Sequence, residues 1–327
     1  MKKPRILSGM RPTGKLHLGH LVGALDNWVR LQDEYECFYC IVDWHALTTH
    51  YDSTAGIREA IIDNAMDWLA AGLDPDRSTI FIQSHVMEHA ELHLLFSMIT
   101  PLPWLERVPS YKEQMTEIKD HDLHTFGFLG YPLLQSADIL MYKANAVPVG
   151  GDQVAHIELT REIARRFNHF YGPVFPEPQT LLTEVPKLPG TDGRKMSKSY
   201  GNTIALSENP VAMKEIVRNM VTDPARIRRT DPGNPDICPV GDYHDVFSDK
   251  KTVAEVDQGC RTAGIGCVQC KMWLFDNLQR KLEPFYERRQ QLEARKQDVA
   301  DILNEGSKKA KAVAAETMAQ VREAMKI

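Results

Sequence analysis

Short apolar runs alternate with amphipathic stretches along the first half of the chain. Arg5–Gly9 and Cys37–Val42 are predicted strands, and the unbroken apolar character of the second is typical of a strand buried in a parallel sheet. Apolar positions three and four residues apart predict helices over His20–Gln32 and Ile57–Ala71. This alternation predicts right-handed crossovers and a parallel sheet with helices on both faces.

The same rhythm resumes after an interruption. Thr79–Ile82 and Ala146–Val149 are further predicted strands, and the turn Gly150–Gln153 leads from the second into a helix that begins at Val154. Between these strands, prolines and scattered charges over residues 84–135 predict a helical insertion. The sequence therefore predicts an α/β fold with a doubly wound, Rossmann-like parallel sheet, whose ligands bind beyond the carboxyl ends of the strands.

Strand patterns vanish from the sequence after residue 200. Prolines between residues 173 and 189 predict a loop before that point. Ser207 is predicted to cap a helix with Pro210 in its first turn, and long amphipathic helices are predicted over Cys267–Gln291 and Val299–Met325. The last third is therefore expected to be all-helical.

The length of 327 residues fits two domains, which we expect at residues 1–192, including the insertion, and at residues 193–327. Apolar content of 43% and charged content of 25% are ordinary for a soluble globular protein. No apolar run has the length of a membrane span, and the early run Ile6-Leu7 is too short for a signal peptide. We expect a cytoplasmic protein that does not enter the membrane.

The net charge of −5 does not by itself favour a nucleic-acid partner. A polyanion would have to meet a local basic face. Candidate residues gather in the C-terminal third, although a charged helical surface explains any one of them equally well. They are Arg226, Arg228, Arg229, Lys250, Lys251, Lys271, Arg280, Lys281, Arg288 and Arg289.

Two short basic motifs, far apart in the chain, point to one chemistry. They are Thr13-Gly14-Lys15-Leu16-His17-Leu18-Gly19-His20 and Arg194-Lys195-Met196-Ser197-Lys198-Ser199. Attack on the α-phosphorus of a polyphosphate is catalysed mostly by positioning and by cancelling charge on the phosphate oxygens. Two imidazoles and two ammonium groups can do this. Either motif alone also fits a solvated polar segment, but the pair favours a nucleotide site.

This pair of motifs resembles the signature of class I aminoacyl-tRNA synthetases. Four further segments are similar to bacterial tryptophanyl-tRNA synthetases, and the resemblance covers essentially the whole chain. They are Ile41–Thr48, Phe81–Ser84, Tyr131–Asp138 and Gly151–Arg161. The resemblance implies an enzyme that activates L-tryptophan with ATP and Mg²⁺ and transfers it from the adenylate to tRNA(Trp). It also implies a homodimer and an anticodon-binding helical domain.

The resemblance further implies which residues bind ATP. The catalytic set is His17, His20, Lys195 and Lys198, and the ATP-binding set adds Gly19, Lys112, Asp152, Met196 and Ser197. The histidines would stabilise the triphosphate in the transition state, and the glycine would let the adenosine lie close. The two loop lysines would neutralise the leaving pyrophosphate, with Lys112 as a weaker phosphate contact. The carboxylate of Asp152 would bond the ribose hydroxyls.

The amino-acid pocket implied by the resemblance comprises Leu7, Tyr131, Gln135, Asp138 and Gln153. Tyr131 and Gln153 would hold the α-amino group, and Asp138 would accept the indole N–H. Tyrosyl-tRNA synthetases, the nearest alternative, have a tyrosine where this chain has Leu7, and an apolar residue there favours an indole over a phenol. Gln135 favours the alternative, because tyrosyl enzymes have glutamine where tryptophanyl enzymes often have methionine.

Two alternatives come from other classes of protein. A small-molecule adenylyltransferase would also use a His-x-Gly-His turn, but it would not need the lysine loop or a helical domain after it. A non-catalytic tRNA-binding paralogue would lose phosphate ligands, whereas all four catalytic candidates are present.

The six cysteines fall into two groups. Cys37 and Cys40 lie on a predicted buried strand, where residues three apart point to opposite faces, so we interpret them as core thiols. The other four are Cys238, Cys260, Cys267 and Cys270. Disulfides are not expected in a cytoplasmic protein, and three clustered cysteines with a remote fourth favour a [4Fe–4S] cluster over Zn²⁺. A subset of bacterial tryptophanyl-tRNA synthetases resembles the chain here, with such a site beside the anticodon-binding region.

Overall fold

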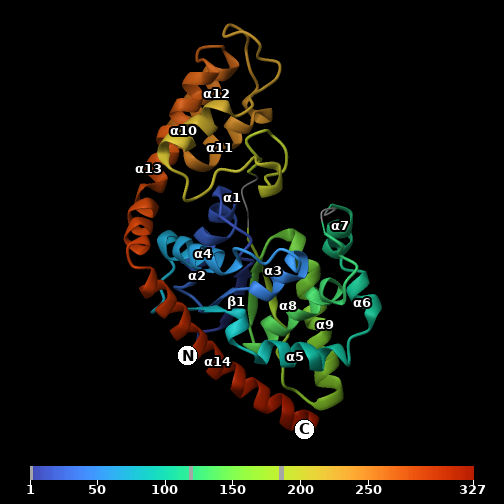
Figure 1. Ribbon diagram of the computed structural model, residues 1–327. Helices are drawn as coiled ribbons and strands as arrows, with labels where there is room; N and C mark the ends of the chain where they lie inside the picture. Colours follow the sequence, from blue (N-terminus) through green and yellow to red (C-terminus); the bar gives the residue numbers. More distant parts are fainter. Residues whose placement is uncertain (1–2, 118–120, 184–187) are drawn as a thin grey trace. The chain divides into compact units, whose positions relative to one another are not determined.

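The computed structural model describes residues 3–117, 121–183 and 188–327 (Figure 1). Contacts divide the chain into two compact units. Unit 1 comprises Met1–Gly14, Asn27–Glu184 and Leu292–Ile327, and unit 2 comprises Lys15–Asp26 and Val185–Gln291. The predicted boundary at residues 192/193 stays a prediction.

Unit 1 is built on a parallel sheet. Its strands are β1 (Arg5–Met10), β2 (Glu36–Ile41), β3 (Ser78–Ile82), β4 (Ala146–Val149) and β5 (Gln179–Leu182). They pair in the order β3-β2-β1-β4-β5, all parallel. The order reverses between β1 and β4, which is the point where doubly wound sheets bind ligands. The predicted doubly wound fold is confirmed.

The strand β5 was not predicted. It lies within residues 173–189, where prolines had indicated only a loop. It is four residues long, follows Pro178 directly and, among the described strands, pairs with β4 alone, and its Leu182 is 68% exposed. An edge strand so short lacks the continuous apolar run that marks a buried strand.

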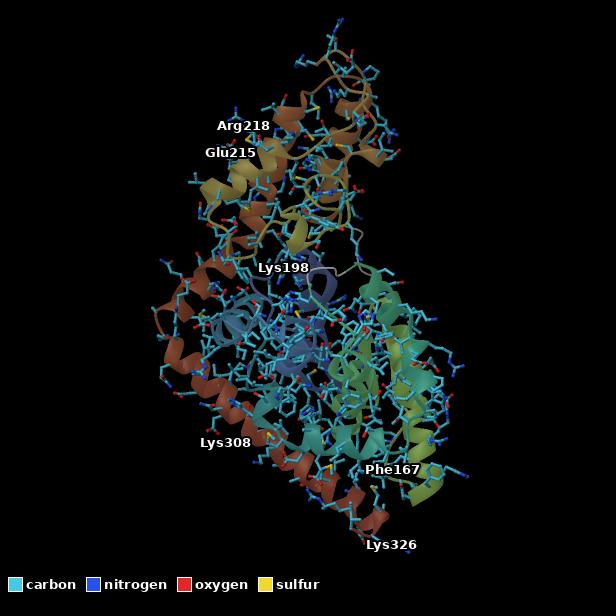
Figure 2. All side chains as sticks on the ribbon, turned by 45° about the vertical axis from the view of Figure 1, so that its right-hand side comes forward. Phe167, Lys198, Glu215, Arg218, Lys308 and Lys326 are labelled. Atoms are coloured by element: carbon cyan, nitrogen blue, oxygen red, sulfur yellow. The ribbon has the colours of Figure 1, made fainter. Side chains whose placement is uncertain are left out.

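Helices cover the sheet of unit 1, and the predicted insertion is helical. The helices described in this unit are α2 (Asp26–Leu31), α3 (Asp43–His50), α4 (Ile57–Ala71), η2 (Gln83–His85), α5 (Glu88–Ser97), α6 (Leu102–Glu106), α7 (Pro109–Glu117), α8 (Phe126–Met141), η3 (Gly151–Gln153), α9 (Val154–Tyr171) and α14 (Lys296–Met325). Phe38, Phe81 and Phe167 of α9 lie in its core, and Figure 2 labels Phe167. The helix α14 packs so closely on β3 that a Cβ at Gly306 would meet the carbonyl oxygen of Ile80 (Figure 1).

Unit 2 is helical, as predicted for the C-terminal region. Its helices are α1 (Leu18–His20), η1 (Leu21–Leu25), η4 (Lys198–Tyr200), α10 (Pro210–Asn219), η5 (Pro235–Ile237), α11 (Pro239–Phe247), α12 (Lys250–Arg261) and α13 (Cys267–Glu293), which ends in unit 1. The cap of α10 is Asn209, not the predicted Ser207. The side chain of Asn209 accepts the backbone N–H of Ala212, because it directly precedes Pro210 at the first helical position.

The helix predicted over His20–Gln32 is divided in the structure. The single turn α1 is followed by the π-helical segment η1 and then by α2 (Asp26–Leu31). Short π-helical segments are frequent at functional sites. None of the described helices is long and apolar enough to cross a membrane.

Candidate active site

Backbone hydrogen bonds hold the two basic motifs together in unit 2. The segment that follows the lysine motif pairs with the first motif in an antiparallel bridge between His17 and Ala205. The N–H of Leu18 donates to the carbonyl oxygen of Ile204 at 3.0 Å, and the N–H of Leu206 donates to that of Leu16 at 2.8 Å. Two segments almost 190 residues apart in sequence thus form one structural element.

The two histidines of the first motif lie against each other. Their ring centroids are 3.8 Å apart. Nδ1 of His20 accepts the backbone N–H of His17 at 3.1 Å, so a neutral His20 carries its proton on Nε2. A Cβ at Gly19 would lie 3.0 Å from the His17 ring and 3.1 Å from the sulfur of Met196. Glycine at this position therefore lets the lysine motif approach the turn that carries the histidines.

Both imidazoles are neutral in the free protein near pH 7. Burial and, to a smaller extent, the charge of Lys198 together lower the pKa of His17 to about 4. Burial also lowers the pKa of His20 to about 3, with smaller effects of His17 and Lys198. Neutral imidazoles can donate hydrogen bonds to phosphate oxygens, whereas the lysines supply positive charge.

The buried Asn202 holds the lysine loop in shape. Its Nδ2 donates to the Asp192 carboxylate at 2.8 Å and to the Lys195 carbonyl oxygen at 3.1 Å, and its Oδ1 accepts the N–H of Ser197 at 2.8 Å. The bond from Asn202, followed by bonds from Arg194, lowers the pKa of Asp192 to about 2. The side chains of Lys195 and Lys198 are exposed on this loop, and Figure 2 labels Lys198. Sequence reasoning did not identify Asn202.

Unit 1 contains a buried carboxylate with three hydrogen-bond donors. Asp138 on α8 is 2% exposed. It accepts from Nε2 of His45 at 2.9 Å, from Nδ1 of His89 at 2.6 Å, and from Nε2 of Gln83, which lies 2.9 Å from both carboxylate oxygens. The orientation of the Gln83 amide is fixed because its Oε1 accepts the N–H of Trp44.

This network keeps Asp138 ionised. Burial raises the pKa of a carboxylate, but the hydrogen bonds and charges of His45 and His89 outweigh that effect and hold the pKa of Asp138 well below its usual range. His89 also bonds the hydroxyl of Tyr142, with 2.7 Å between Nε2 and the oxygen. The sequence indicated Asp138 but not its donors, although two of them fall in the segments that resemble the synthetases.

The other predicted amino-acid residues lie in the same unit. Leu7 is buried in the core that includes Leu133 of α8. The hydroxyl of Tyr131 lies 2.9 Å from the Ser110 hydroxyl. Gln135 is half-buried one turn before Asp138 on α8. Nε2 of Gln153 donates to the Asp152 carboxylate at 3.0 Å.

The two remaining phosphate and ribose candidates are exposed. Asp152 follows the carboxyl end of β4 in the η3 turn, beside the switch point of the sheet. Lys112 is on the outer helix α7.

The four cysteines of the C-terminal region lie near one another in unit 2. Burial, followed by the charges of Cys238, Cys260 and Cys267, raises the pKa of Cys270 to about 12. None of the four forms a disulfide. Within the described ranges, no three His, Cys, Asp or Glu side chains are arranged to hold a single metal ion. Cys37 and Cys40 are core thiols on β2, 1% and 0% exposed.

The basic candidates are not all at the surface. Lys271 is 9% exposed, and its Nζ donates to the carbonyl oxygen of Arg218 at 2.9 Å. Arg289 is 5% exposed. Both predictions of surface charge are corrected, because their positions on α13 face the packed interior. Those that remain exposed are Arg228, Arg229, Lys250, Lys251, Arg280, Lys281 and Arg288.

Comparison with known proteins decides the family. Residues 1–283 match the family "tRNA synthetases class I (W and Y)". The tryptophan–tRNA ligase of Thermotoga maritima is 58% identical over 325 residues, which are 99% of each chain. This chain belongs to the class I tRNA synthetases and, among them, to the tryptophan–tRNA ligases.

Two further comparisons agree with this family. The tryptophan–tRNA ligase of Ralstonia nicotianae is 48% identical, and the match covers 98% of each chain. The crystal structure of tryptophanyl-tRNA synthetase from Campylobacter jejuni, complexed with ADP and tryptophan, superposes with a TM-score of 0.89 at 31% identity, over 99% of this chain and 100% of that one. The predicted recognition as a class I aminoacyl-tRNA synthetase of the tryptophan branch is confirmed.

Proposed function

We propose that this ligase joins L-tryptophan to tRNA(Trp) in two steps, with ATP and Mg²⁺ as the source of activation. The observation that supports this most directly is the backbone pairing of the two phosphate motifs in unit 2. It brings two imidazoles and two lysines to one element, as stabilisation of a pentacovalent phosphorus requires. Both ATP and tRNA are cytoplasmic substrates, so we place the enzyme in the cytoplasm.

In the first step a carboxylate oxygen of tryptophan attacks the α-phosphorus. The new P–O bond forms as the bond from the α-phosphorus to the α,β-bridging oxygen breaks, and pyrophosphate leaves with both electrons of that bond. Nε2–H of His20 and the ring of His17 bind phosphate oxygens, and Lys195 and Lys198 neutralise the leaving group. When bound, Mg²⁺ supplies further charge neutralisation on the phosphates.

The remaining residues orient ATP. Met196 and Ser197 shape the loop that carries the two lysines, and Gly19 leaves room for the adenosine. Asp152 bonds the ribose hydroxyls, and Lys112 is an additional phosphate contact. In the second step a terminal hydroxyl of the tRNA attacks the mixed anhydride, which forms the ester and releases AMP.

The tryptophan side chain is selected by Asp138. An ionised, buried carboxylate accepts an indole N–H, and an analogue without that donor leaves the acceptor unpaired. Each carboxylate oxygen of Asp138 already accepts hydrogen bonds from two donors, so one of these donors must move when the indole N–H binds. His45 is the most exposed of the three, with 10% of its side chain accessible, and is the one we expect to move. Leu7 and Gln135 form the wall, and Tyr131 and Gln153 bind the ammonium.

Amino-acid-dependent exchange of pyrophosphate into ATP tests the proposal. We expect exchange with tryptophan and none above background with tyrosine or phenylalanine at equal concentration, because neither ring presents an N–H to Asp138. Better exchange with tyrosine would support the tyrosyl alternative. No exchange with any amino acid, in protein that still binds tRNA, would support a non-catalytic paralogue.

A second copy of the chain is the protein partner we propose. The resemblance implies a homodimer, and the helical insertion exposes an apolar face on and beside α5. Met87, Leu94 and Met98 follow one another along one side of that helix, with Leu102 just beyond, and each is 56–67% exposed. Exposed apolar patches of this kind mark interaction surfaces.

The exposed basic residues of unit 2 are the proposed contacts to tRNA(Trp).

Sedimentation at micromolar concentration should give twice the chain mass of 37.1 kDa. Leu94→Arg is expected to shift the protein to the monomer by placing a charge in the contact. Leu182→Arg, at a leucine of the edge strand β5 that is also exposed, should leave the dimer intact. A wild-type monomer, or a dimer in Leu94→Arg, would contradict this contact.

We also propose that Cys238, Cys260, Cys267 and Cys270 hold a [4Fe–4S] cluster. The four thiolates would be the ligands of the cluster. Three cysteines close together in sequence with a remote fourth fit such a cluster better than Zn²⁺, the alternative, which usually takes paired C-x-x-C segments.

Neighbouring side chains also fit an anionic cluster. Nη1 of Arg226 lies 3.7 Å from the sulfur of Cys260, and its Nε is buried without a partner in the described structure. Nε2 of His244 lies 3.5 Å from the sulfur of Cys270. An unpaired buried donor beside a thiol indicates an absent acceptor, which cluster sulfide would supply. The cluster would shape the tRNA-binding surface and take no part in tryptophan activation.

Anaerobically purified protein should be brown and contain equal amounts of iron and acid-labile sulfide. Cys267→Ser is expected to lose both and to weaken tRNA charging much more than tryptophan activation, whereas Cys37→Ser should retain the iron. Colourless protein with stoichiometric zinc would refute the cluster. Equal loss of activation and charging in folded Cys267→Ser would refute its proposed role.

A further inference from the structure

Helix α7, which carries Lys112, is connected to the body of unit 1 through the side chain of Ser110. The Ser110 oxygen lies 2.9 Å from the hydroxyl oxygen of Tyr131 on α8 and 2.6 Å from Nε2 of His156 on α9. The hydroxyl of Thr116 on the same helix donates within the helix to the carbonyl oxygen of Glu113, and the ring of Tyr111 packs against Phe128 of α8. The one serine therefore joins three helices.

The direction of the hydrogen bonds through Ser110 is not fixed by the protein alone. Burial lowers the pKa of His156 to about 4, so its ring is neutral and has one N–H. Its Nδ1 is buried and has no partner among the described residues. The chain can run from Nε2–H of His156 to Ser110 and on to Tyr131, or in the reverse direction, because both hydroxyls donate and accept.

A bound ammonium group would choose between the two directions. An ammonium is a donor only, so it needs a lone pair on the Tyr131 oxygen. Tyr131 then donates its own proton to the Ser110 oxygen, and Ser110 donates to Nε2 of His156. In this arrangement Ser110 is held by one accepted and one donated bond, both oriented by the ligand. Polarised chains of this kind are stronger than their isolated bonds.

We propose that Ser110 is a positioning residue that couples the tryptophan ammonium to helix α7 and thereby to Lys112, two residues farther along it. The inference rests on the proposed roles of Tyr131 in amino-acid binding and of Lys112 in phosphate binding. Tryptophan then fixes the helix that contacts the phosphates, and ATP fixes the serine that supports the tryptophan site. By linkage each ligand raises the affinity for the other by the same factor.

The coupling can be measured with an ATP analogue that has a methylene group in place of the α,β-bridging oxygen, so that it binds without reacting. In the wild type, saturating tryptophan is expected to lower the Kd of this analogue about fivefold or more. In Ser110→Ala the Kd of the analogue with tryptophan and its Kd without tryptophan should agree within about twofold, because alanine has no hydroxyl to bond Tyr131 and His156. Ser110→Thr keeps the hydroxyl and should keep the wild-type ratio of the Kd without tryptophan to the Kd with tryptophan.

Thr116→Ala is the matched control, because it removes a hydroxyl from the same helix without breaking the link to Tyr131. It should keep the wild-type ratio. Tyr131→Phe removes the hydroxyl at the other end of the link, so tryptophan should no longer change the Kd of the analogue, as in Ser110→Ala. This second variant tests the inference if Ser110→Ala fails to fold.

Coupling retained in Ser110→Ala, or lost in Thr116→Ala, would overturn the inference. So would a wild-type protein that exchanges pyrophosphate with tryptophan but shows no coupling. That last result would leave the proposed function intact, whereas absence of exchange would refute the function itself.

Discussion

Asp138→Ala is expected to lower kcat/KM for tryptophan in pyrophosphate exchange by about 30-fold or more, which corresponds to about 2 kcal/mol. The substitution removes the proposed acceptor of the indole N–H. It also leaves the donors of His45, His89 and Gln83 without their shared acceptor in a buried site. A near-wild-type value would remove Asp138 from the tryptophan pocket.

Stability measurements separate these two effects. Breaking a buried charged network costs about 3 kcal/mol or more in the free energy of unfolding. Asp138→Asn keeps the size of the side chain, but its amide N–H₂ would face the donor groups of His45, Gln83 and His89. We therefore expect this variant to lose stability as well. His89→Gln, which removes a donor that we do not expect to contact the ligand, should lower stability with a smaller effect on kcat/KM. Equal kinetic effects in His89→Gln and Asp138→Ala would show that packing alone explains the loss.

The sign of the pH dependence follows from the lowered pKa of Asp138. A carboxyl group whose pKa is lower in the folded state stabilises the protein above the unfolded-state pKa of about 3.9. That contribution is lost as the pH falls through the folded value. The wild type should therefore lose more unfolding free energy than Asp138→Ala on acidification below about pH 4. Identical acid profiles would contradict an ionised Asp138.

The sequence predicted most elements of the fold, but it missed the edge strand β5 and the π-helical segment η1. Strands such as β2 have continuous apolar runs, and their alternation with helices predicted the doubly wound sheet. The edge strand β5 has no such run, and the π-helical segment η1 has the same apolar spacing as an α-helix. Both are set by tertiary packing, which overrides local pattern.

The residues around the site show the same limit. Asp138 was indicated by the resemblance to the synthetases. Its donors His45, Gln83 and His89 come from three separate elements, and no spacing in the sequence shows that they meet. Asn202 was likewise missed, because its role depends on the folded path of the lysine loop. Convergence of distant segments, rather than residue type, is what the structure adds.

Lys198→Ala and Lys195→Ala are each expected to lower kcat for adenylate formation by about 100-fold, with little change in KM for ATP. Negative charge grows on the leaving pyrophosphate as the bond breaks, so a neutralising ammonium acts more on the transition state than on bound ATP. The charge of Lys198 acts on both His17 and His20, which places it near the imidazoles that we propose bind the triphosphate.

Arg194→Ala is the control for these lysine variants. Arg194 lies in the same loop, but its guanidinium is paired with Asp192 at 2.6 Å and stacks over the ring of Tyr200. Its loss should change kcat by much less than loss of either lysine. The Lys198→Ala protein should also show a pKa of His17 above 4 by NMR titration, because one of the two effects that lower it is gone. An increase in KM for ATP at unchanged kcat would make the lysines ground-state binders, and an equal effect in Arg194→Ala would indicate a general disturbance of the loop.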